Sequence, residues 1–128
     1  IPEVKFGVIP GDANVLLDQN IPAAIAREMF FTGDSITAQR AYEIGLVNKV
    51  VKPEALMAEA TAMAEKISAN SPLALQGIKE LFARSRDMDY RKATSLYGQV
   101  NRRILKSEDY KEGMASVRER RKPNWQGI

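Results

Sequence analysis

One carboxylate stands in an otherwise apolar segment at the start of the chain. Glu3 lies in the sequence PEVKFGVIPG, which covers residues 2–11 and is bounded by prolines. Burial of a carboxylate among apolar residues raises its pKa toward the range in which it transfers protons at neutral pH. The other interpretation is an exposed carboxylate at the edge of a short strand. The spacing alone favours this second interpretation, because a lone acid is a weak signal.

A second group of candidate residues is basic and lies near the end of the chain. It consists of Arg118, Arg120, Arg121 and Lys122. Clustered cations pair strongly with phosphate groups, so the cluster could bind a polyanion. The same charges are also expected on a solvated helix end, where cations interact favourably with the helix dipole. The residues themselves leave both alternatives open.

The composition limits the chemistry that the chain can perform. The 128 residues include no Cys and no His, so thiolates, disulfides and the commonest general base and metal ligand are missing. Acid–base chemistry therefore falls to carboxylates, Lys or Tyr, and we expect no metal site. A net charge of +3 is too small to indicate a nucleic-acid partner. Because no apolar run approaches the roughly 20 residues of a membrane span, we expect a cytoplasmic protein without membrane contact.

Hydrophobic periodicity predicts mainly helices around these candidate residues. Apolar residues spaced by three and four predict five helical segments. They are 22–31, 37–45, 53–82, 93–104 and 107–123. The segment 53–82 is interrupted and starts again at Ser71 and Pro72. The short apolar, Pro-bounded stretch 1–10 predicts a strand or a tight turn, and the Val-rich stretch 46–51 predicts a short strand. The expected fold class is mainly α with one or two short strands.

Four ordered segments resemble the crotonase superfamily, in particular its enoyl-CoA hydratase/isomerase family. PEVKFGVIPG is similar to the segment that carries the family's second catalytic glutamate. AREMFFTG (26–33) and ITAQRAYEIGLVNKVV (36–51) are similar to the stretch that follows, and SEDYKEGMASVRERRKP (107–123) to the closing helix. The resemblance covers nearly the whole chain and implies the C-terminal half of a family member. A start at Ile1, without Met, leads us to expect truncation or cleavage.

The resemblance implies a parent fold of the α/β crotonase type, a ββα superhelix followed by a C-terminal helical region. Residues 1–51 would then form the end of the core, with the second-glutamate segment and the helices that follow it. Residues 52–128 would form the helical region that mediates oligomerisation. The full-length protein would be a homotrimer or a dimer of trimers.

The resemblance also implies an enzyme, a lyase or isomerase, that adds water to a 2-enoyl-CoA or isomerises it. It needs no cofactor, because coenzyme A is part of the acyl-CoA substrate. Glu3 falls at the second glutamate, which exchanges a proton at the α-carbon, and Gly11 falls where a backbone N–H helps to place the water. Arg120 falls near the CoA phosphates, and Val117 borders the acyl pocket. The first glutamate and the oxyanion loop belong to the family's N-terminal half, so we expect the isolated chain to be inactive.

One departure from the family pattern leaves the reaction type open. Gly11 is followed by DANVLL (12–17), where the family usually continues with further glycines. Hydration, isomerisation and a dehydration of the carnitinyl-CoA type therefore all remain as alternative reactions. An alternative from another class is a non-catalytic helical oligomerisation module that keeps the family's C-terminal architecture.

Overall fold

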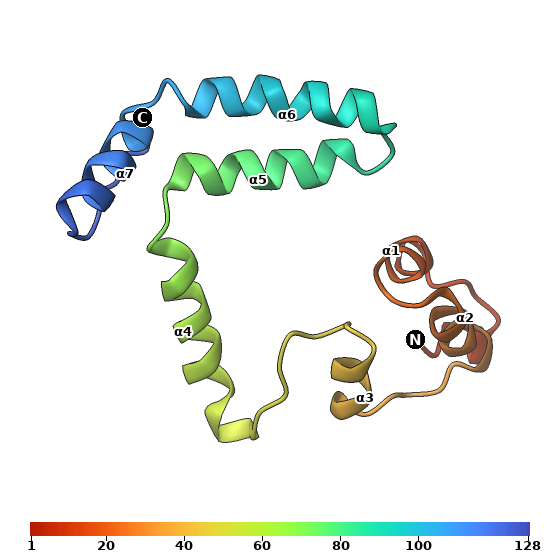
Figure 1. Ribbon diagram of the computed structural model, residues 1–128. Helices are drawn as coiled ribbons and strands as arrows, with labels where there is room; N and C mark the ends of the chain where they lie inside the picture. The colour runs from red at the N-terminus through yellow and green to blue at the C-terminus, as the bar shows by residue number, and fades with distance from the viewer. The chain divides into compact units, whose positions relative to one another are not determined.

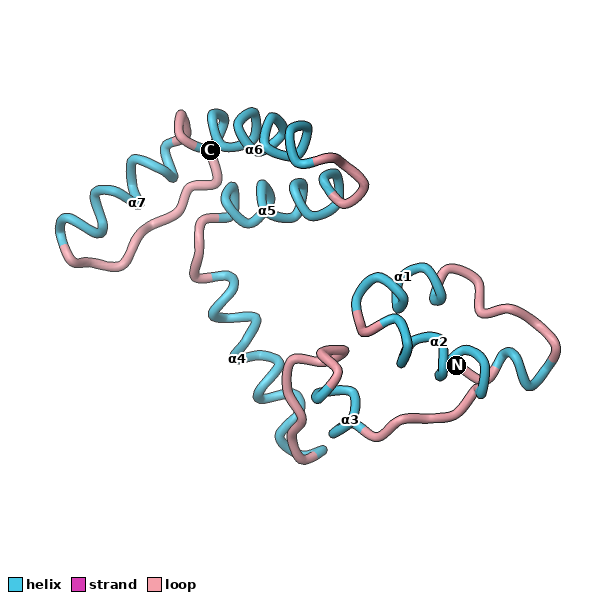
Figure 2. The backbone as a smooth tube through the Cα atoms, turned by 45° about the vertical axis from the view of Figure 1, so that its right-hand side comes forward, coloured by secondary structure: helices cyan, strands magenta, loops and turns pink.

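The computed structural model describes residues 1–128, except for the side chain of Asn14. The chain forms two compact units, Ile1–Leu56 and Met57–Ile128, called here the first and the second unit. All regular structure in the described residues is helical (Figure 1 and Figure 2). None of the described helices is both long and apolar enough to cross a membrane.

The first unit is built from short helices around a small apolar core. They are η1 (Glu3–Phe6), α1 (Ala13–Asn20), α2 (Ala23–Thr32), α3 (Ala38–Glu43) and η2 (Pro53–Ala55), where η marks a 3-10 helix. Pro22 precedes α2, and Gly33 ends it in the left-handed conformation, with φ of 65°. The Thr37 side chain caps α3 by accepting a hydrogen bond from the N–H of Arg40 at 3.1 Å. The buried core residues are Ile21, Ala26, Met29 and Ile44.

The second unit consists of longer amphipathic helices, three of which begin at a capping side chain. The helices are α4 (Leu56–Ser68, whose first residue belongs to the first unit), α5 (Pro72–Ser85), α6 (Tyr90–Ile104) and α7 (Glu108–Glu119). Side-chain oxygens cap the last three helices, from Ser71, Asp89 and Ser107 respectively. Helices α5 and α6 lie side by side as a hairpin (Figure 2). Gly77 permits this approach, because a Cβ there would lie 2.6 Å from Cδ1 of Ile104.

The strand predicted at 46–51 is wrong for this chain, and at 1–10 the strand alternative is wrong and the tight turn is present. Residues 3–6 form a 3-10 turn instead, in which the N–H of Lys5 donates to the carbonyl of Pro2 at 2.9 Å. At the second position, the N–H of Leu46 donates to the Ala41 carbonyl at 2.8 Å, which continues the end of α3. A strand needs a neighbouring strand to satisfy its backbone groups, and the described residues supply none.

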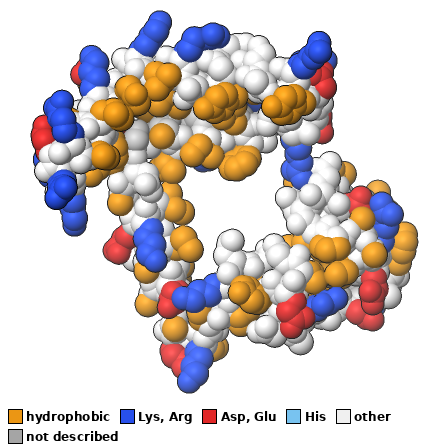
Figure 3. Space-filling model, viewed as in Figure 1, with side chains coloured by type: hydrophobic (Ala, Val, Ile, Leu, Met, Phe, Trp, Pro, Cys, Tyr) orange, Lys and Arg blue, Asp and Glu red, His pale blue; other side chains and the backbone are white. Residues whose placement is uncertain are grey.

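Large apolar side chains are exposed in both units, as the space-filling view shows (Figure 3). In the first unit, Phe6 and Phe31 are 77% and 79% exposed, and in the second unit Phe82 is 76% exposed. Large apolar side chains exposed in this number favour association. We therefore expect the isolated chain to associate, with a light-scattering mass that rises with concentration. A compact monomer at every concentration would contradict this expectation.

Candidate functional site

Glu3 is half-buried on η1, and one of its carboxylate oxygens is unusual. The oxygen Oε2 is buried and has no hydrogen-bond partner among the described residues. Buried polar atoms in proteins are nearly always paired, and an unpaired one costs free energy. Oε2 is therefore an acceptor that a bound molecule could use, either for a hydrogen bond or for a proton.

Gly11 lies in the turn that joins η1 to α1. Its φ of 56° is in the left-handed region, which glycine adopts without steric cost. The N–H of Ala13 donates to the carbonyl of Pro10 at 3.3 Å, but the N–H of Gly11 pairs with no acceptor in the described part of the chain. Glu3 and Gly11 thus both offer unpaired polar groups within the first unit.

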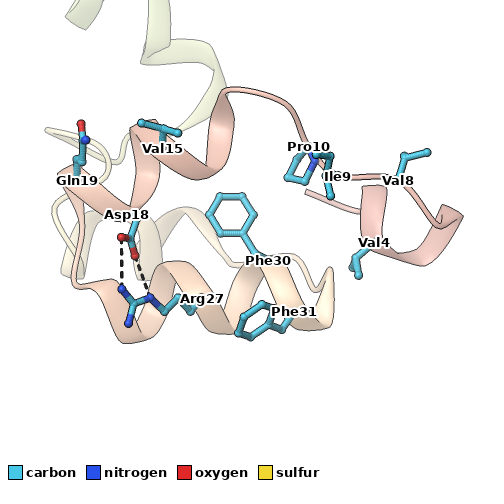
Figure 4. A pocket seen from close by; sticks show the side chains of 10 residues that line it. All are labelled: Val4, Val8, Ile9, Pro10, Val15, Asp18, Gln19, Arg27, Phe30 and Phe31. Atoms are coloured by element: carbon cyan, nitrogen blue, oxygen red, sulfur yellow. Dashed lines mark hydrogen bonds and ion pairs between the residues drawn. The ribbon is translucent and has the colours of Figure 1, made fainter.

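An apolar pocket of about 570 Å³ in the first unit is lined by sequence neighbours of these two residues, but not by Glu3 or Gly11 themselves (Figure 4). Val4 and Pro10, the direct neighbours of Glu3 and Gly11, belong to its wall. Arg27 and Asp18 form an ion pair of 3.2 Å at the polar part of the pocket. The other lining residues are Val8, Ile9, Val15, Gln19, Phe30 and Phe31. Its apolar wall suits an apolar group rather than an ion.

Sequence reasoning did not find this pocket. Val15, on α1, and Phe30, on α2, come from helices whose packing the hydrophobic pattern does not reveal. The available signal was the pair of adjacent aromatic residues, Phe30 and Phe31, because consecutive residues of a helix point in different directions and a second contact surface is needed to cover both.

Arg120 is distinguished within the basic cluster by its backbone and by its free side chain. It is the only described residue other than glycine with a positive φ, 53°, and it ends α7. Its guanidinium has no ion-pair partner among the described residues, whereas Arg121 pairs with Glu119 at 2.7 Å and Arg118 pairs with Glu119 at 3.6 Å. Val117, one turn before Arg120, is 77% exposed. Both residues belong to the second unit.

The segment after Arg120 is fixed by an ion pair between Arg121 and Glu112. The Arg121 guanidinium donates to Oε2 of Glu112 at 2.8 Å, and the N–H of Asn124 donates to Oε1 at 2.7 Å. These bonds, the guanidinium first, lower the pKa of Glu112 to about 2. Arg121 therefore serves the fold of the tail, which leaves Arg120 and Lys122 as the cations available to a ligand.

A buried carboxylate holds the end of the chain. Asp109 is 1% exposed, and its Oδ1 accepts hydrogen bonds from the N–H groups of Gln126 at 2.8 Å and Gly127 at 2.9 Å. The hydroxyl of Ser71 donates to Oδ2 at 2.8 Å. Burial by itself raises the pKa of Asp109, but the bonds from Gly127, Ser71 and Gln126 together hold it below its usual value. The sequence shows no sign of this anchor, because its partners are distant in the chain.

These two carboxylates predict an acid-dependent release of the tail that Trp125 can report. The indole N–H of Trp125, the only tryptophan, donates to the Ala69 carbonyl at 2.8 Å. Because the pKa of Glu112 falls from 4.5 to about 2 on folding, its stabilising contribution is complete above pH 4.5 and is lost as the pH falls toward 2. Trp125 emission should therefore shift to the red over this range.

The matched test of this prediction compares Glu112→Gln with Glu108→Gln. The side chain of Glu108 pairs with Lys111 at its own helix start, and its backbone N–H, which donates to the Ile128 carbonyl, is unchanged by the substitution, so Glu108→Gln should keep the wild-type profile. Glu112→Gln should show red-shifted emission already at neutral pH. An unchanged acid profile in Glu112→Gln would contradict the assignment.

Comparisons with known proteins place this geometry in a family. The enoyl-CoA hydratase/isomerase family model matches residues 1–128. Carnitinyl-CoA dehydratases of Salmonella arizonae and Proteus mirabilis are 36% and 34% identical to the chain over 132 residues, which cover 99% of the chain and 51% of each relative.

Solved structures agree with the sequence relatives. The crystal structure of enoyl-CoA hydratase from Mycobacterium tuberculosis H37Rv has a TM-score of 0.96 and 40% identity, over 100% of this chain and 51% of that one. For enoyl-CoA hydratase from Bacillus anthracis the TM-score is 0.95 and the identity 31%, over 99% and 50%. The chain spans about half the length of the relatives it matches. It belongs to the enoyl-CoA hydratase/isomerase family, within the crotonase superfamily.

Proposed function

We propose that the chain is the C-terminal half of an acyl-CoA enzyme in which Glu3 exchanges a proton with the α-carbon of the substrate. The observation that carries this proposal is the buried, unpaired Oε2 of Glu3. In the direction of hydration, the water oxygen bonds to the β-carbon of a 2-enoyl-CoA while the π bond breaks, and the α-carbon takes a proton. A carboxyl group at Glu3 supplies that proton, and its carboxylate removes it again in the reverse direction. The proton that the water loses goes to the first glutamate, which the resemblance places in the N-terminal half, and exchange with solvent then restores both carboxyl groups.

The names of the relatives support a reaction that moves water. They describe a dehydratase of carnitinyl-CoA and a hydratase of enoyl-CoA. A carboxylate suits both directions, because the same group that donates the α-proton in one direction accepts it in the other. We propose that Gly11 helps to place the water through its unpaired N–H, and no cofactor is needed, since coenzyme A is part of the substrate.

We propose that Arg120 contacts a CoA phosphate and that Val117 borders the acyl chain. The free guanidinium of Arg120 supports the first role, because a cation that is not already paired has all its donors available for charge-assisted bonds to phosphate. The exposure of Val117 leaves its side chain available for an apolar contact. We further propose that residues 1–51 complete the catalytic core and that residues 52–128 assemble a cytoplasmic homotrimer or dimer of trimers.

The proposal is tested by assaying the full-length protein beside the isolated chain. Substrates are a 2-enoyl-CoA for hydration, a 3-enoyl-CoA for isomerisation and carnitinyl-CoA for dehydration. The full-length protein should turn over at least one of them, and the isolated chain none, because its described residues offer a single candidate carboxylate. A full-length protein that is folded and assembled but inactive on all three would favour the non-catalytic oligomerisation module.

A further inference from the structure

Glu3 is carried by a helix that has little support of its own. Helix η1 contains no buried residue, and the bonds that shape it are local, such as the N–H of Val8 to the carbonyl of Glu3 at 3.2 Å. A carboxylate that acts on one carbon atom must nevertheless be held within a fraction of an ångström. The position of Glu3 therefore depends on the surface against which η1 lies, and in the first unit that surface is the end of α2.

The end of α2 provides a space that only glycine leaves open. Gly33 is buried there, and a Cβ added to it would lie 3.0 Å from Cε of Lys5 and 3.1 Å from Cγ1 of Val4. Both side chains belong to η1, and Figure 4 shows Val4 pointing toward the end of α2. The two residues after Glu3 thus occupy the volume that a side chain at position 33 would take.

An exposed ion pair also joins η1 to the residue that follows the end of α2. The ammonium group of Lys5 pairs with Oδ1 of Asp34 at 2.9 Å, and the N–H of Asp34 donates to the hydroxyl of Thr32 at 3.2 Å. The side chains of Lys5 and Asp34 are 50% and 73% exposed, so the pair contributes little to the free energy of unfolding. Its effect is to orient η1 on the end of α2.

Helix termination alone does not explain the contacts of Gly33. Gly45, after α3, has an equally left-handed φ of 78°, but no atom lies within 4 Å of a Cβ built there. Gly45 thus meets only a backbone requirement, whereas Gly33 meets a backbone requirement and a contact requirement. This difference separates the two glycines experimentally.

We propose that Gly33 is a positioning residue for the reaction: it receives Val4 and Lys5, and through them it sets the place of the Glu3 carboxylate. We call the contact surface formed by Gly33 and Asp34 the seat of η1; Gly33 contacts Val4 and Lys5, and Asp34 pairs with Lys5. The inference rests on the proposed role of Glu3. It adds the requirement that position 33 carry no side chain, although Gly33 itself does not touch the substrate.

The test compares Gly33→Ala with Gly45→Ala in the full-length enzyme. Both variants place a side chain at a positive φ, so both should lose thermal stability, and Gly33→Ala should lose more because its Cβ also meets Val4 and Lys5. Only Gly33→Ala must displace the side chains of Val4 and Lys5, by a few tenths of an ångström, and we expect η1 to shift with them. Since a 1 Å misplacement can cost about 10²-fold in rate, we expect Gly33→Ala to lower kcat roughly three- to tenfold with KM unchanged. Gly45→Ala should keep normal kcat.

A double-mutant cycle with Glu3→Gln shows whether Gly33 acts through Glu3. Without the carboxylate there is nothing to position, so Gly33→Ala should cause no further loss in the Glu3→Gln background. An equal loss in both backgrounds, or equal kcat in the two glycine variants, would overturn the positioning role alone. Normal turnover in Glu3→Gln would overturn the proposed function and this inference with it.

A second pair of variants keeps the test decisive if Gly33→Ala does not fold. Lys5→Glu places two negative charges together at the seat and should lower kcat, with KM unchanged. Lys5→Glu combined with Asp34→Lys restores the pair with its charges exchanged and should recover most of the rate. A double variant no better than Lys5→Glu would count against the seat.

Discussion

Replacing Glu3 by Gln in the full-length enzyme should lower kcat by about 10²–10⁴-fold, the usual contribution of general acid–base catalysis. Gln keeps the size of the side chain and removes the group that titrates. Because proton exchange stabilises only the transition state, KM for the thioester should change little. Glu3→Asp, which retracts the carboxylate by one methylene, should recover only part of the rate.

The control for this prediction is a Glu→Gln change elsewhere in the first unit. Glu28 is exposed on α2, and Glu28→Gln should leave both kcat and KM near the wild-type values. If Glu3→Gln also keeps near-normal turnover in hydration, isomerisation and dehydration, Glu3 is a structural residue and the family membership speaks to the fold alone.

Removing the Arg120 side chain should produce the second-largest effect, on KM. A hydrogen bond to a charged group contributes about 1.5–3 kcal/mol, so Arg120→Ala should raise KM for CoA thioesters about 10- to 150-fold with little change in kcat. Thioesters of pantetheine, which lack the nucleotide phosphates, should not register the loss. Equal effects on both substrates would contradict the phosphate contact.

Two further variants separate charge from backbone strain at this position. Because φ at Arg120 is 53°, Arg120→Gly removes the guanidinium while relieving the left-handed strain. Arg120→Gly should raise KM as much as Arg120→Ala does. Its thermal unfolding temperature should be at least as high as that of the wild type. Arg118→Ala removes a cation that already pairs with Glu119, and it should change KM much less.

The helices were predictable where local signals agree with packing. Thr37, Ser71 and Ser107 each cap a helix that the periodicity predicts. Helix α1 was not predicted, since its apolar residues Val15, Leu16 and Leu17 are consecutive and mark no single face. The strands failed for a different reason: strand propensity is realised only beside another strand, and the described residues hold no such partner.

The candidate site was predictable only in part. Residue type and the resemblance identified Glu3, but no pattern reveals that its Oε2 is buried without a partner. The basic cluster was visible as a group, whereas the pairing of Arg121 with Glu112, nine positions away, depends on how the tail folds back. The contact of Gly33 with Lys5 likewise joins residues far apart in the chain. Tertiary contacts of this kind leave no periodic trace in a sequence.

The central claim, that Glu3 exchanges a proton at the α-carbon, is tested most directly by solvent deuterium incorporation. The full-length protein and its Glu3→Gln variant are incubated with the acyl-CoA product in deuterium oxide, and deuterium at the α-carbon is followed by mass spectrometry. We expect the wild type to incorporate deuterium and the variant to do so at least about 10²-fold more slowly. Equal incorporation by both proteins would contradict the claim.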